Sequence, residues 1–360
     1  MSTDFANKNV LVLGAGVTGK SVARFLASQG AKVTLTDDNS IDAVKPEAVD
    51  VKNFDAAVIS PGWRQDQPLV VKILDSSLEL LNEIDIAWKL RSSRAPRQKW
   101  IAVTGTNGKT TTVEMTAAIL QAAGIKATAC GNVGDTVIDA VDRDDAYEVL
   151  VLELSSFQLH WAKQAQFQAA TILNIADDHL DWHGTFEAYA DAKFSILDRA
   201  EIAILNADDG AVVTRANRFS GRKVFFSIDT PAPGEIGVVE ELLVDRAFVS
   251  DPQQASMICE LVDIVPTVLE LAGIEQPKKY GEKAAPPLQG RSFVECLTNP
   301  TAPPPHEALW WCHDGHRAVR QSDWKLVAAR DEPWELYDLS LDRTEQINLA
   351  SSHPEQVKQL

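Results

Sequence analysis

Apolar residues along the first ninety positions form short runs, and between the first two runs they recur with the spacing of a helix. The runs NVLVLG, KVTLTDD and AAVISPG have the length and composition of strands, and SVARFLASQG between the first two reads as a helix. Strands that alternate with crossover helices form parallel sheets. Residues 1–93 are therefore predicted to form a Rossmann-like α/β domain.

The same alternation returns in a second block of the chain. It follows the basic, proline-containing stretch RSSRAPRQ, which is predicted to be a linker. From Lys99 onward the apolar runs are WIAVTG, EVLVLEL, AATILNI and IAILNA. Residues 94–250 are therefore predicted to form another α/β domain with a mainly parallel sheet.

The pattern changes from about Asp251. The segment SMICELVDIVPTVLELAG predicts a helix, and it is followed by proline-rich stretches and by the Trp-rich segments ALWWCH, HRAVRQSDWKLVAA and PWELYDL. Their alternation and aromatic content predict an antiparallel sheet, followed by a C-terminal helix. Residues 251–360 are therefore predicted to form a small α+β tail.

Composition and charge narrow the classes of function. The 360 residues are 45% hydrophobic, which is enough to bury real cores, and no apolar run approaches about 18 residues. The first apolar stretch follows no basic segment of the kind that begins an export signal, so we expect a cytoplasmic protein. A formal charge of −17 disfavours nucleic acid and anionic membranes as partners. The four cysteines form no C-x-x-C pair, which disfavours a zinc knuckle and a disulfide framework.

The segment IAVTGTNGKTTT carries the strongest chemical signal. An apolar strand enters a turn bracketed by Gly105 and Gly108, and Lys109 and Thr110 then open a helical pattern. Such a turn points backbone N–H groups at phosphate oxygens, the lysine adds a positive charge, and the hydroxyl can bind Mg²⁺. The glycine spacing is shorter than in the common pattern, and a purely structural turn is the alternative. We predict a nucleotide-phosphate site here.

A second glycine-rich turn follows the first strand of the chain. Gly14, Gly16 and Gly19 form G-A-G-V-T-G, and Asp37 closes the next strand, as in a dinucleotide or nucleotide-diphosphate site. The alternative is that these glycines only pack a helix against a strand. Ser60-Pro61-Gly62 ends another strand at the same predicted sheet edge, where open α/β sheets bind ligands.

The second block contains three further candidates. Glu153 ends an apolar strand, where burial of a carboxylate is costly unless it binds a metal or forms hydrogen bonds. His179 follows another strand and has Asp178 and Asp181 nearby in sequence, although a solvated loop histidine is an equal alternative. Lys193 lies on a predicted helix face, and composition alone indicates a surface charge.

Five motifs follow one another along the chain: GTNGKTTT, GNVG, LELSSFQLH, LNIADDHLDWHG and the pair Ala192-Lys193. Their order resembles that of the Mur ligases of peptidoglycan synthesis. The resemblance extends over residues 8–249, and LELSSFQL is nearest to the branch that joins D-glutamate to UDP-N-acetylmuramoyl-L-alanine. In this family ATP phosphorylates the carboxylate of that substrate, and the amine of D-glutamate attacks the acyl phosphate to form an amide.

The resemblance also implies roles for individual residues. ATP phosphates would be held by Gly105, Thr106, Asn107, Gly108, Lys109, Thr110 and Thr111. UDP would be held by Gly16, Val17, Thr18, Asp37 and Gly62, and the muramoyl-alanine portion by Asn132, Ser155 and Gln158. Thr110 and Glu153 would bind one Mg²⁺, and His179 and a carbamylated Lys193 a second. Catalysis would depend on Lys109, Glu153, His179 and Lys193.

The tail departs from this family. The resemblance implies that a G-x-H-N motif and a third domain with the D-glutamate site should follow residue 249. Residues 251–360 contain neither this motif nor the pattern of such a domain. They resemble instead the C-terminal part of type I sulfatases, through DIVPTVLELAGIE, PLQGRSF, HRAVRQSDWKLV and WELYDLSLDRTEQINLA. No cysteine has the C-x-P-x-R context of a sulfatase nucleophile, so His313, His316 and Lys325 are expected to be structural. The predicted function is a ligase with weak or absent amide formation; the alternatives are a non-catalytic nucleotide-binding chimera and a hydrolase.

Overall fold

The computed structural model describes most of the chain. The described residues are 5–239, 242–248, 256–258, 263–271, 273, 275, 278–280, 283–284, 287–288, 290–298, 302, 305–313, 315–342 and 345–360. Contacts divide the chain into two compact units, Met1–Glu240 with Val244–Ser256 and Glu241–Leu243 with Met257–Leu360. None of the helices described is long and apolar enough to cross a membrane.

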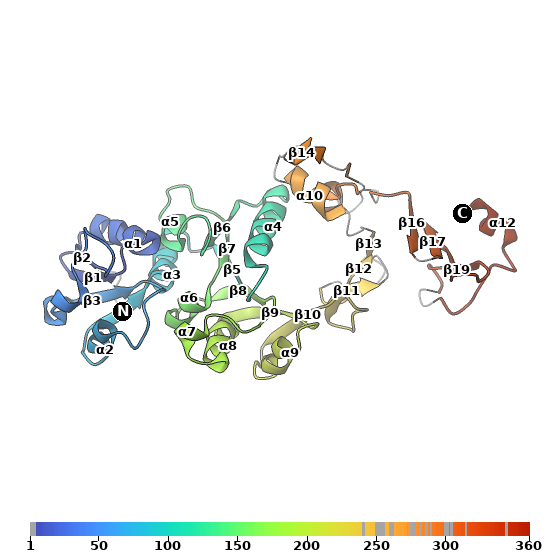
Figure 1. Ribbon diagram of the computed structural model, residues 1–360. Coiled ribbons are helices and arrows are strands. Elements are labelled where there is room, and N and C mark those ends of the chain that lie inside the picture. Colours follow the sequence, from blue (N-terminus) through green and yellow to red (C-terminus); the bar gives the residue numbers. More distant parts are fainter. Residues whose placement is uncertain are drawn as a thin grey trace. The chain divides into compact units, whose positions relative to one another are not determined.

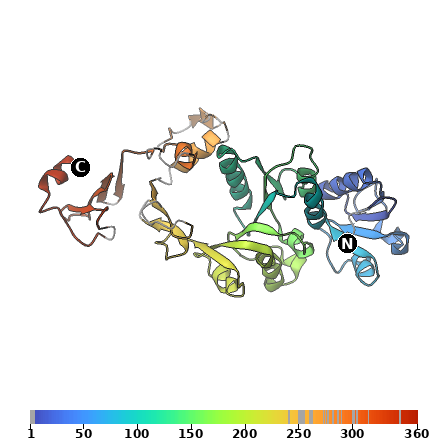
Figure 2. The same cartoon turned by 180° about the vertical axis from the view of Figure 1, so that it is seen from behind.

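The N-terminal sheet has four strands in the order β2-β1-β3-β4, and all neighbours are parallel. Alternate residues of β1 face opposite sides, so Val12 packs in one cluster with Phe25 of α1, and Leu13 in another with Ile73 of α2. Helices α1 and α2 accordingly cover opposite faces (Figures 1 and 2). The elements are β1 (Asn9–Leu13), α1 (Val17–Ser28), β2 (Lys32–Thr36), η1 (Pro46–Ala48), η2 (Val51–Asn53), β3 (Ala56–Ile59), α2 (Pro68–Leu74), β4 (Glu79–Asn82) and α3 (Glu83–Arg94).

Within the described residues, the second sheet has nine strands in the order β13-β12-β11-β10-β9-β8-β5-β7-β6. The pairs from β6 to β11 are parallel, as the sequence predicts. Val103 of β5 packs against Val113 of α4, whereas Ala102 belongs to the larger cluster that contains Tyr189 of α8. The strands are β5 (Lys99–Thr104), β6 (Ala127–Gly131), β7 (Val149–Glu153), β8 (Phe167–Ile172), β9 (Ala200–Asn206), β10 (Arg222–Phe226), β11 (Glu235–Val239), β12 (Leu242–Asp245) and β13 (Ser256–Ile258).

The helices of this block follow the strands in the pattern of an α/β domain. Apart from Lys193, which lies in the last turn of α8, each predicted phosphate or metal residue lies where a strand ends or a helix begins, because the carboxyl ends of parallel strands meet at one sheet edge. The helices are α4 (Lys109–Ala122), α5 (Val137–Val141), α6 (Ser156–Trp161), α7 (Leu180–His183), α8 (Phe186–Phe194), η3 (Leu197–Arg199) and α9 (Gly210–Ala216).

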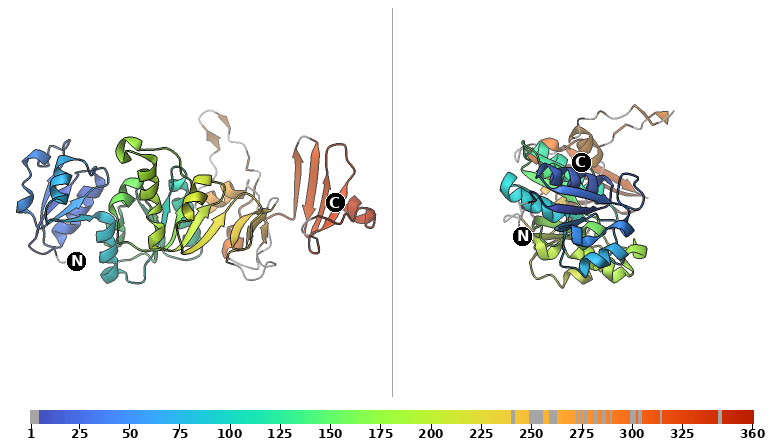
Figure 3. Two further views of the ribbon diagram at one scale, coloured as in Figure 1. Left: turned by 90° about the horizontal axis from the view of Figure 1, so that it is seen from below. Right: turned by 90° about the vertical axis from the view of Figure 1, so that its left-hand side faces the viewer.

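The C-terminal unit contains the predicted antiparallel sheet, with strand order β16-β17-β18-β19 (Figure 3). Lys325 of this sheet is largely buried, and its ammonium lies 2.7 Å from a Glu345 carboxylate oxygen. His316 is exposed, and the side chain of His313 lies outside the described residues. The elements are α10 (Ile264–Leu271), β14 (Lys279–Tyr280), β15 (Lys283–Ala284), α11 (Val294–Thr298), β16 (Ala308–His313), β17 (His316–Gln321), β18 (Trp324–Ala328), β19 (Glu335–Asp338) and α12 (Pro354–Gln359).

The helix predicted at the start of the tail was too long. Residues Ser256–Ile258 form strand β13, and α10 spans only Ile264–Leu271. Strand β13 lies next to β12 in the second sheet, so pairing with a neighbouring strand overrode the helical pattern at these three residues. Asp263 directly precedes α10, and its fully buried carboxylate accepts a hydrogen bond from the Arg291 backbone N–H and lies 2.8 Å from His306 Nε2.

The predicted linker also began too early. RSSR is the last turn of α3, which ends at Arg94. Arginines in a last turn interact favourably with the helix dipole, and the Arg91 side chain donates to the Gln98 carbonyl at 2.6 Å. The helix stops at the residue before Ala95-Pro96, as expected where a proline follows. Only residues 95–98 connect α3 to β5.

Candidate nucleotide, magnesium and substrate sites

The turn between β5 and α4 has the backbone of a phosphate-binding loop. Gly105 and Gly108 have φ of +151° and +81°, a region that disfavours side chains. The N–H groups of Thr106 and Asn107 donate to Asn174 Oδ1 at 3.1 and 2.8 Å, so a neighbouring loop already fixes the first half of the turn. Helix α4 then begins at Lys109, and its N-terminus favours a negatively charged group.

Lys109 and Thr110 point to different partners. The Lys109 ammonium donates to the Thr106 carbonyl at 2.8 Å and thus lies across the loop. The Thr110 hydroxyl donates to Glu153 Oε2 at 2.7 Å. The first helical turn therefore presents a cation and a hydroxyl that is already joined to an acidic side chain from the neighbouring strand.

Glu153 is buried at the end of β7, with 2% of its surface exposed. Its Oε1 accepts from the Asn132 amide at 2.8 Å, and its Oε2 accepts from Thr110. Strand β6 ends beside it, because Gly131 pairs with Glu153 in parallel register. A Cβ at Gly131 would lie 2.6 Å from the Glu153 carbonyl oxygen, so glycine permits this close approach. The network satisfies both carboxylate oxygens, which offsets much of the cost of burial.

Lys193 is buried and not on the surface, contrary to the expectation from composition. It is 2% exposed on α8, and its ammonium donates to the Gly105 carbonyl at 2.7 Å. Burial, followed by the nearby charge of Lys109, lowers the pKa of Lys193 to about 7. A large fraction of this amine is therefore neutral near pH 7.5. The helical pattern around Lys193 did not reveal this, because the burial comes from the phosphate loop.

His179 lies in a strained position beside the same helix. It precedes α7 with φ of +51°, and its ring centroid lies 6.5 Å from that of Tyr189. The Lys193 ammonium lies 4.9 Å from the Tyr189 ring, and the Tyr189 hydroxyl lies 2.9 Å from the Thr106 hydroxyl. Tyr189 thus lies between His179, Lys193 and the phosphate loop. The sequence interpretation did not include Tyr189, although it lies four residues before Lys193 on the same helix.

The donor set is suited in part to Mg²⁺. The Thr110 hydroxyl and the Glu153 carboxylate are oxygen ligands of the kind that Mg²⁺ prefers, and they are already adjacent. An ammonium at Lys193 does not fit a cation site, whereas a carbamylated lysine would supply oxygen. Within the described residues no three His, Cys, Asp or Glu side chains converge as a metal site. Only the first predicted Mg²⁺ position therefore has two adjacent oxygen donors from the protein.

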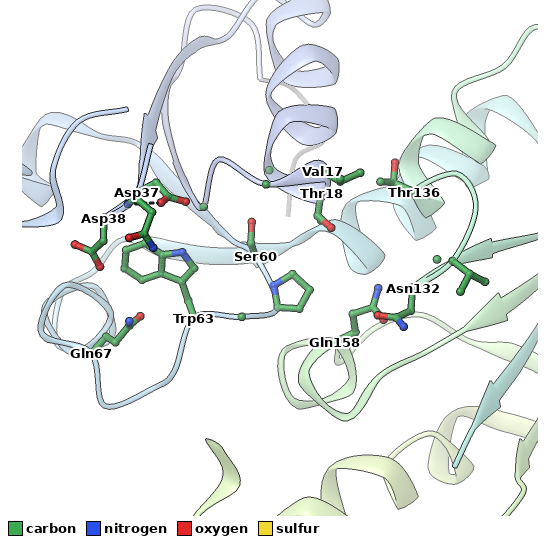
Figure 4. Close-up of a pocket in the computed structure, with 18 of the residues that line it drawn as sticks. Val17, Thr18, Asp37, Asp38, Ser60, Trp63, Gln67, Asn132, Thr136 and Gln158 are labelled. Atoms are coloured by element: carbon green, nitrogen blue, oxygen red, sulfur yellow. Dashed lines mark hydrogen bonds between the residues drawn. The ribbon is translucent and has the colours of Figure 1, made fainter. Parts of the chain in front are cut away.

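A separate cavity of about 610 Å³ lies between residues of the two parallel sheets (Figure 4). The glycine-rich turn after β1 and the loop after β3 line one side, and the loop after β6 and helix α6 line the other. Among the residues predicted to bind substrate, those lining it are Gly16, Val17, Thr18, Asp37, Gly62, Asn132 and Gln158. Lining residues that the sequence interpretation missed include Asp38, Asn39, Trp63, Gln67 and Thr136.

Ser155 is not among the residues that line this cavity. Its side chain caps α6 by accepting from the Gln158 N–H at 3.2 Å, and the Gln158 side chain accepts from the Ser155 N–H at 3.0 Å. This capping box fixes the orientation of Gln158 toward the cavity. Ser155 therefore acts on the cavity through Gln158.

Asp37 supports the glycine-rich turn. Its carboxylate accepts from the N–H groups of Ala15 and Asn39 at 2.7 and 2.8 Å. The bond from Ala15 is the main reason that the pKa of Asp37 is lowered. An ionised Asp37 thus joins the ends of β1 and β2 at the cavity rim. Its carboxylate oxygens can accept further hydrogen bonds from a ligand that would bind in the cavity.

The fold and these sites define an α/β protein with a phosphate-loop turn and a separate ligand cavity. The sequence profile of the Mur ligase middle domain matches residues 103–260. A UDP-N-acetylmuramoylalanine–D-glutamate ligase of Streptomyces coelicolor is 40% identical over 326 residues, which cover 82% of this chain and 69% of that protein. The chain belongs to the Mur ligase family.

Two further similarities complete the comparison. The ligase of the same name from Thermobifida fusca is 42% identical over 285 residues, which cover 73% of this chain and 61% of the relative. The chain therefore spans about three fifths of that relative's length. A solved UDP-N-acetylmuramate:L-alanyl-gamma-D-glutamyl-meso-diaminopimelate ligase from Neisseria meningitides is 14% identical with a TM-score of 0.46, covering 75% of this chain and 95% of that one. These matches lend no support to the sulfatase resemblance, which stays a prediction.

Proposed function

We propose that this chain binds Mg·ATP at the loop of residues 105–111 and UDP-N-acetylmuramoyl-L-alanine in the cavity, and that it phosphorylates the substrate carboxylate. Asn132 carries this proposal, because it lines the cavity and also donates to Glu153 at 2.8 Å. A single side chain thus joins the substrate cavity to the acidic group beside the phosphate loop. The names of the relatives support this choice of substrate.

The protein side chains would act mainly through charge and alignment. Lys109 and the N-terminus of α4 would hold the phosphates, and Thr110 with Glu153 would hold Mg²⁺, which supplies neutralisation of phosphate charge when bound. His179 and Lys193 would serve a second Mg²⁺ if Lys193 were carbamylated. For that modification the neutral amine attacks CO₂, forms an N–C bond and loses a proton. The pKa of about 7 favours the neutral amine.

Substrate-dependent formation of ADP is the direct test of this proposal. ADP and acyl phosphate are expected when the chain, Mg·ATP and UDP-N-acetylmuramoyl-L-alanine are mixed, and little ADP without the UDP-sugar. The acyl phosphate can be trapped with hydroxylamine and identified by mass spectrometry. Equal ADP formation with and without the UDP-sugar would contradict the proposal.

Addition of D-glutamate is a separate question in the same assay. We expect little amide product from residues 1–360, because residues 251–360 contain no G-x-H-N motif of the kind that the family resemblance implies. Efficient formation of the dipeptide product would overturn that expectation. Nucleotide binding without any ADP would favour the alternative of a non-catalytic binding protein. Sulfate-ester hydrolysis would be needed to support the hydrolase alternative. We also propose a cytoplasmic location, as the sequence predicts.

Replacing Glu153 with glutamine is expected to weaken Mg²⁺-dependent nucleotide binding by at least about 10-fold. The amide keeps the size of the side chain but removes the negative charge. In the unaltered chain, the Asn132 amide and the Thr110 hydroxyl both donate to the carboxylate. In the variant, the NH₂ group of the glutamine faces one of these two donors and cannot accept its hydrogen bond. Calorimetric titration with ADP, with and without Mg²⁺, measures the effect. Metal-free ADP provides the control, since its affinity should change much less; an equal loss in both titrations would indicate a folding defect.

A further inference from the structure

The loop that follows β3 contacts both the cavity and the His179 turn. Residues 60–63 line the cavity. The Gly62 carbonyl accepts from the Trp182 indole N–H at 3.3 Å, and the Arg64 guanidinium donates to the Asp181 carbonyl. The Trp63 carbonyl accepts from the Trp161 indole N–H at 3.2 Å. Three hydrogen bonds therefore tie one wall of the cavity to the second sheet's helices.

Two of these bonds end on the short helix that His179 begins. Helix α7 spans Leu180–His183, and His179 is its N-cap residue. Trp182 and His179 also lie against one aromatic ring, because their ring centroids are 4.9 and 4.6 Å from that of Phe157. The backbone and the shared ring leave little freedom for Trp182 to move without His179.

We infer that Trp182 and Arg64 are positioning residues, which link the orientation of His179 to the occupation of the cavity. This inference rests on the proposed function, because it assigns His179 to the nucleotide side and the cavity to UDP. A ligand that orders the loop at residues 60–64 fixes the Gly62 carbonyl, which accepts from Trp182, and the Arg64 guanidinium, which donates to the Asp181 carbonyl. UDP and Mg·nucleotide are then expected to bind cooperatively, and the effect must be the same in both directions.

Trp161 provides a matched comparison. It makes the same kind of indole bond to the same loop, but it lies at the end of α6 and not in the turn that contains His179. If the bonds only dock the two sheets together, loss of either indole N–H should have the same consequence. If they position His179, only the Trp182 bond should affect the coupling.

Calorimetric titration of the full chain with UDP and with Mg·ADP, each alone and in the presence of the other, tests the inference. UDP lacks the carboxylate of the full substrate, which the reaction would bring next to the nucleotide. Any coupling between UDP and Mg·ADP therefore has to pass through the protein. UDP is expected to raise the affinity for Mg·ADP by about 5-fold or more. Trp182→Phe and Arg64→Gln should each bring this factor close to 1, and Trp161→Phe should leave it unchanged.

The outcomes are distinct. Loss of coupling in Trp182→Phe with retained binding of each ligand supports the inference. If Trp182→Phe does not fold, Arg64→Gln repeats the test at a partly exposed side chain. Retained coupling in both variants overturns it, as does independent binding in the unaltered chain. Binding of neither UDP nor Mg·ADP overturns the proposed function and this inference with it.

Discussion

Replacing Lys193 with methionine is expected to stabilise the folded chain and to abolish substrate-dependent ADP formation. Methionine has a similar length but removes a charge that is 2% exposed, and burial of that charge is what lowers the lysine pKa to about 7. The shift corresponds to a cost on the order of a few kcal/mol in the protonated form. Loss of the bond to the Gly105 carbonyl offsets part of the gain. A net increase in unfolding free energy of about 1–3 kcal/mol is expected at pH 6.

The sign of this effect depends on pH. Below pH 7 the lysine is protonated in both the folded and the unfolded chain, so the folded state carries the full cost of burying the charge. Between pH 7 and about 10 the folded chain has lost the proton that the unfolded chain still holds, and stability rises with pH. The advantage of methionine should therefore be largest below pH 7 and diminish as pH rises. Denaturant unfolding at pH 6 and pH 9 measures it.

Lys72→Met serves as the control for this prediction. Lys72 is an exposed lysine on α2, so its replacement should change neither ADP formation nor the pH dependence of stability. A Lys193→Met variant that is less stable at pH 6 than the unaltered chain would contradict the burial argument. A variant that still forms ADP at the usual rate would remove Lys193 from the reaction.

The sequence predicted β1, β2, β3, β5, β7, β8 and β9, because each is a short apolar run in a parallel sheet. It did not predict β4, β6 or β10 to β12, and it placed the residues of β13 in a helix. Alternation in β1 placed Val12 and Leu13 on opposite faces, and helices covered both. Boundaries were less accurate where distant residues decide them. Asp263, the residue before α10, contacts Arg291 and His306, which no local pattern reveals.

The candidate sites were predictable where the residue type itself carries the chemistry. Lys109, Thr110 and Glu153 were singled out from their motifs, and the structure brings them to one strand end. Lys193 was named only through the family resemblance, and its burial was not predicted, since that burial depends on a loop almost ninety residues earlier. The contacts of Trp161 and Trp182 were also missed, because an indole N–H that donates to a distant carbonyl has no signature in local sequence.

Replacing Gly19 with alanine is expected to disrupt the N-terminal sheet. Helix propensity favours alanine over glycine by about 1 kcal/mol within α1. The added Cβ, however, would lie 1.8 Å from the Gly14 carbonyl oxygen and 2.8 Å from its carbon. Both atoms belong to the backbone, so no side-chain rotation relieves the overlap, and the helix would have to move away from β1. The clash therefore outweighs the propensity, and we expect a loss of at least about 3 kcal/mol in unfolding free energy.

The same displacement should weaken UDP binding, because Gly14 and Gly19 both line the cavity. Gly16→Ala is the matched control for stability: its φ is −74°, and no atom lies within 4 Å of the added Cβ. Gly16 is the N-cap residue of α1, where alanine is less favourable than glycine, so the unfolding free energy of this variant should fall by no more than about 1 kcal/mol. Hydrogen exchange of the β1 and α1 amides, with thermal unfolding, separates local disruption from global loss. Equal protection in Gly19→Ala and Gly16→Ala would show that α1 can shift without cost, and would contradict the tight approach of this helix to the turn after β1.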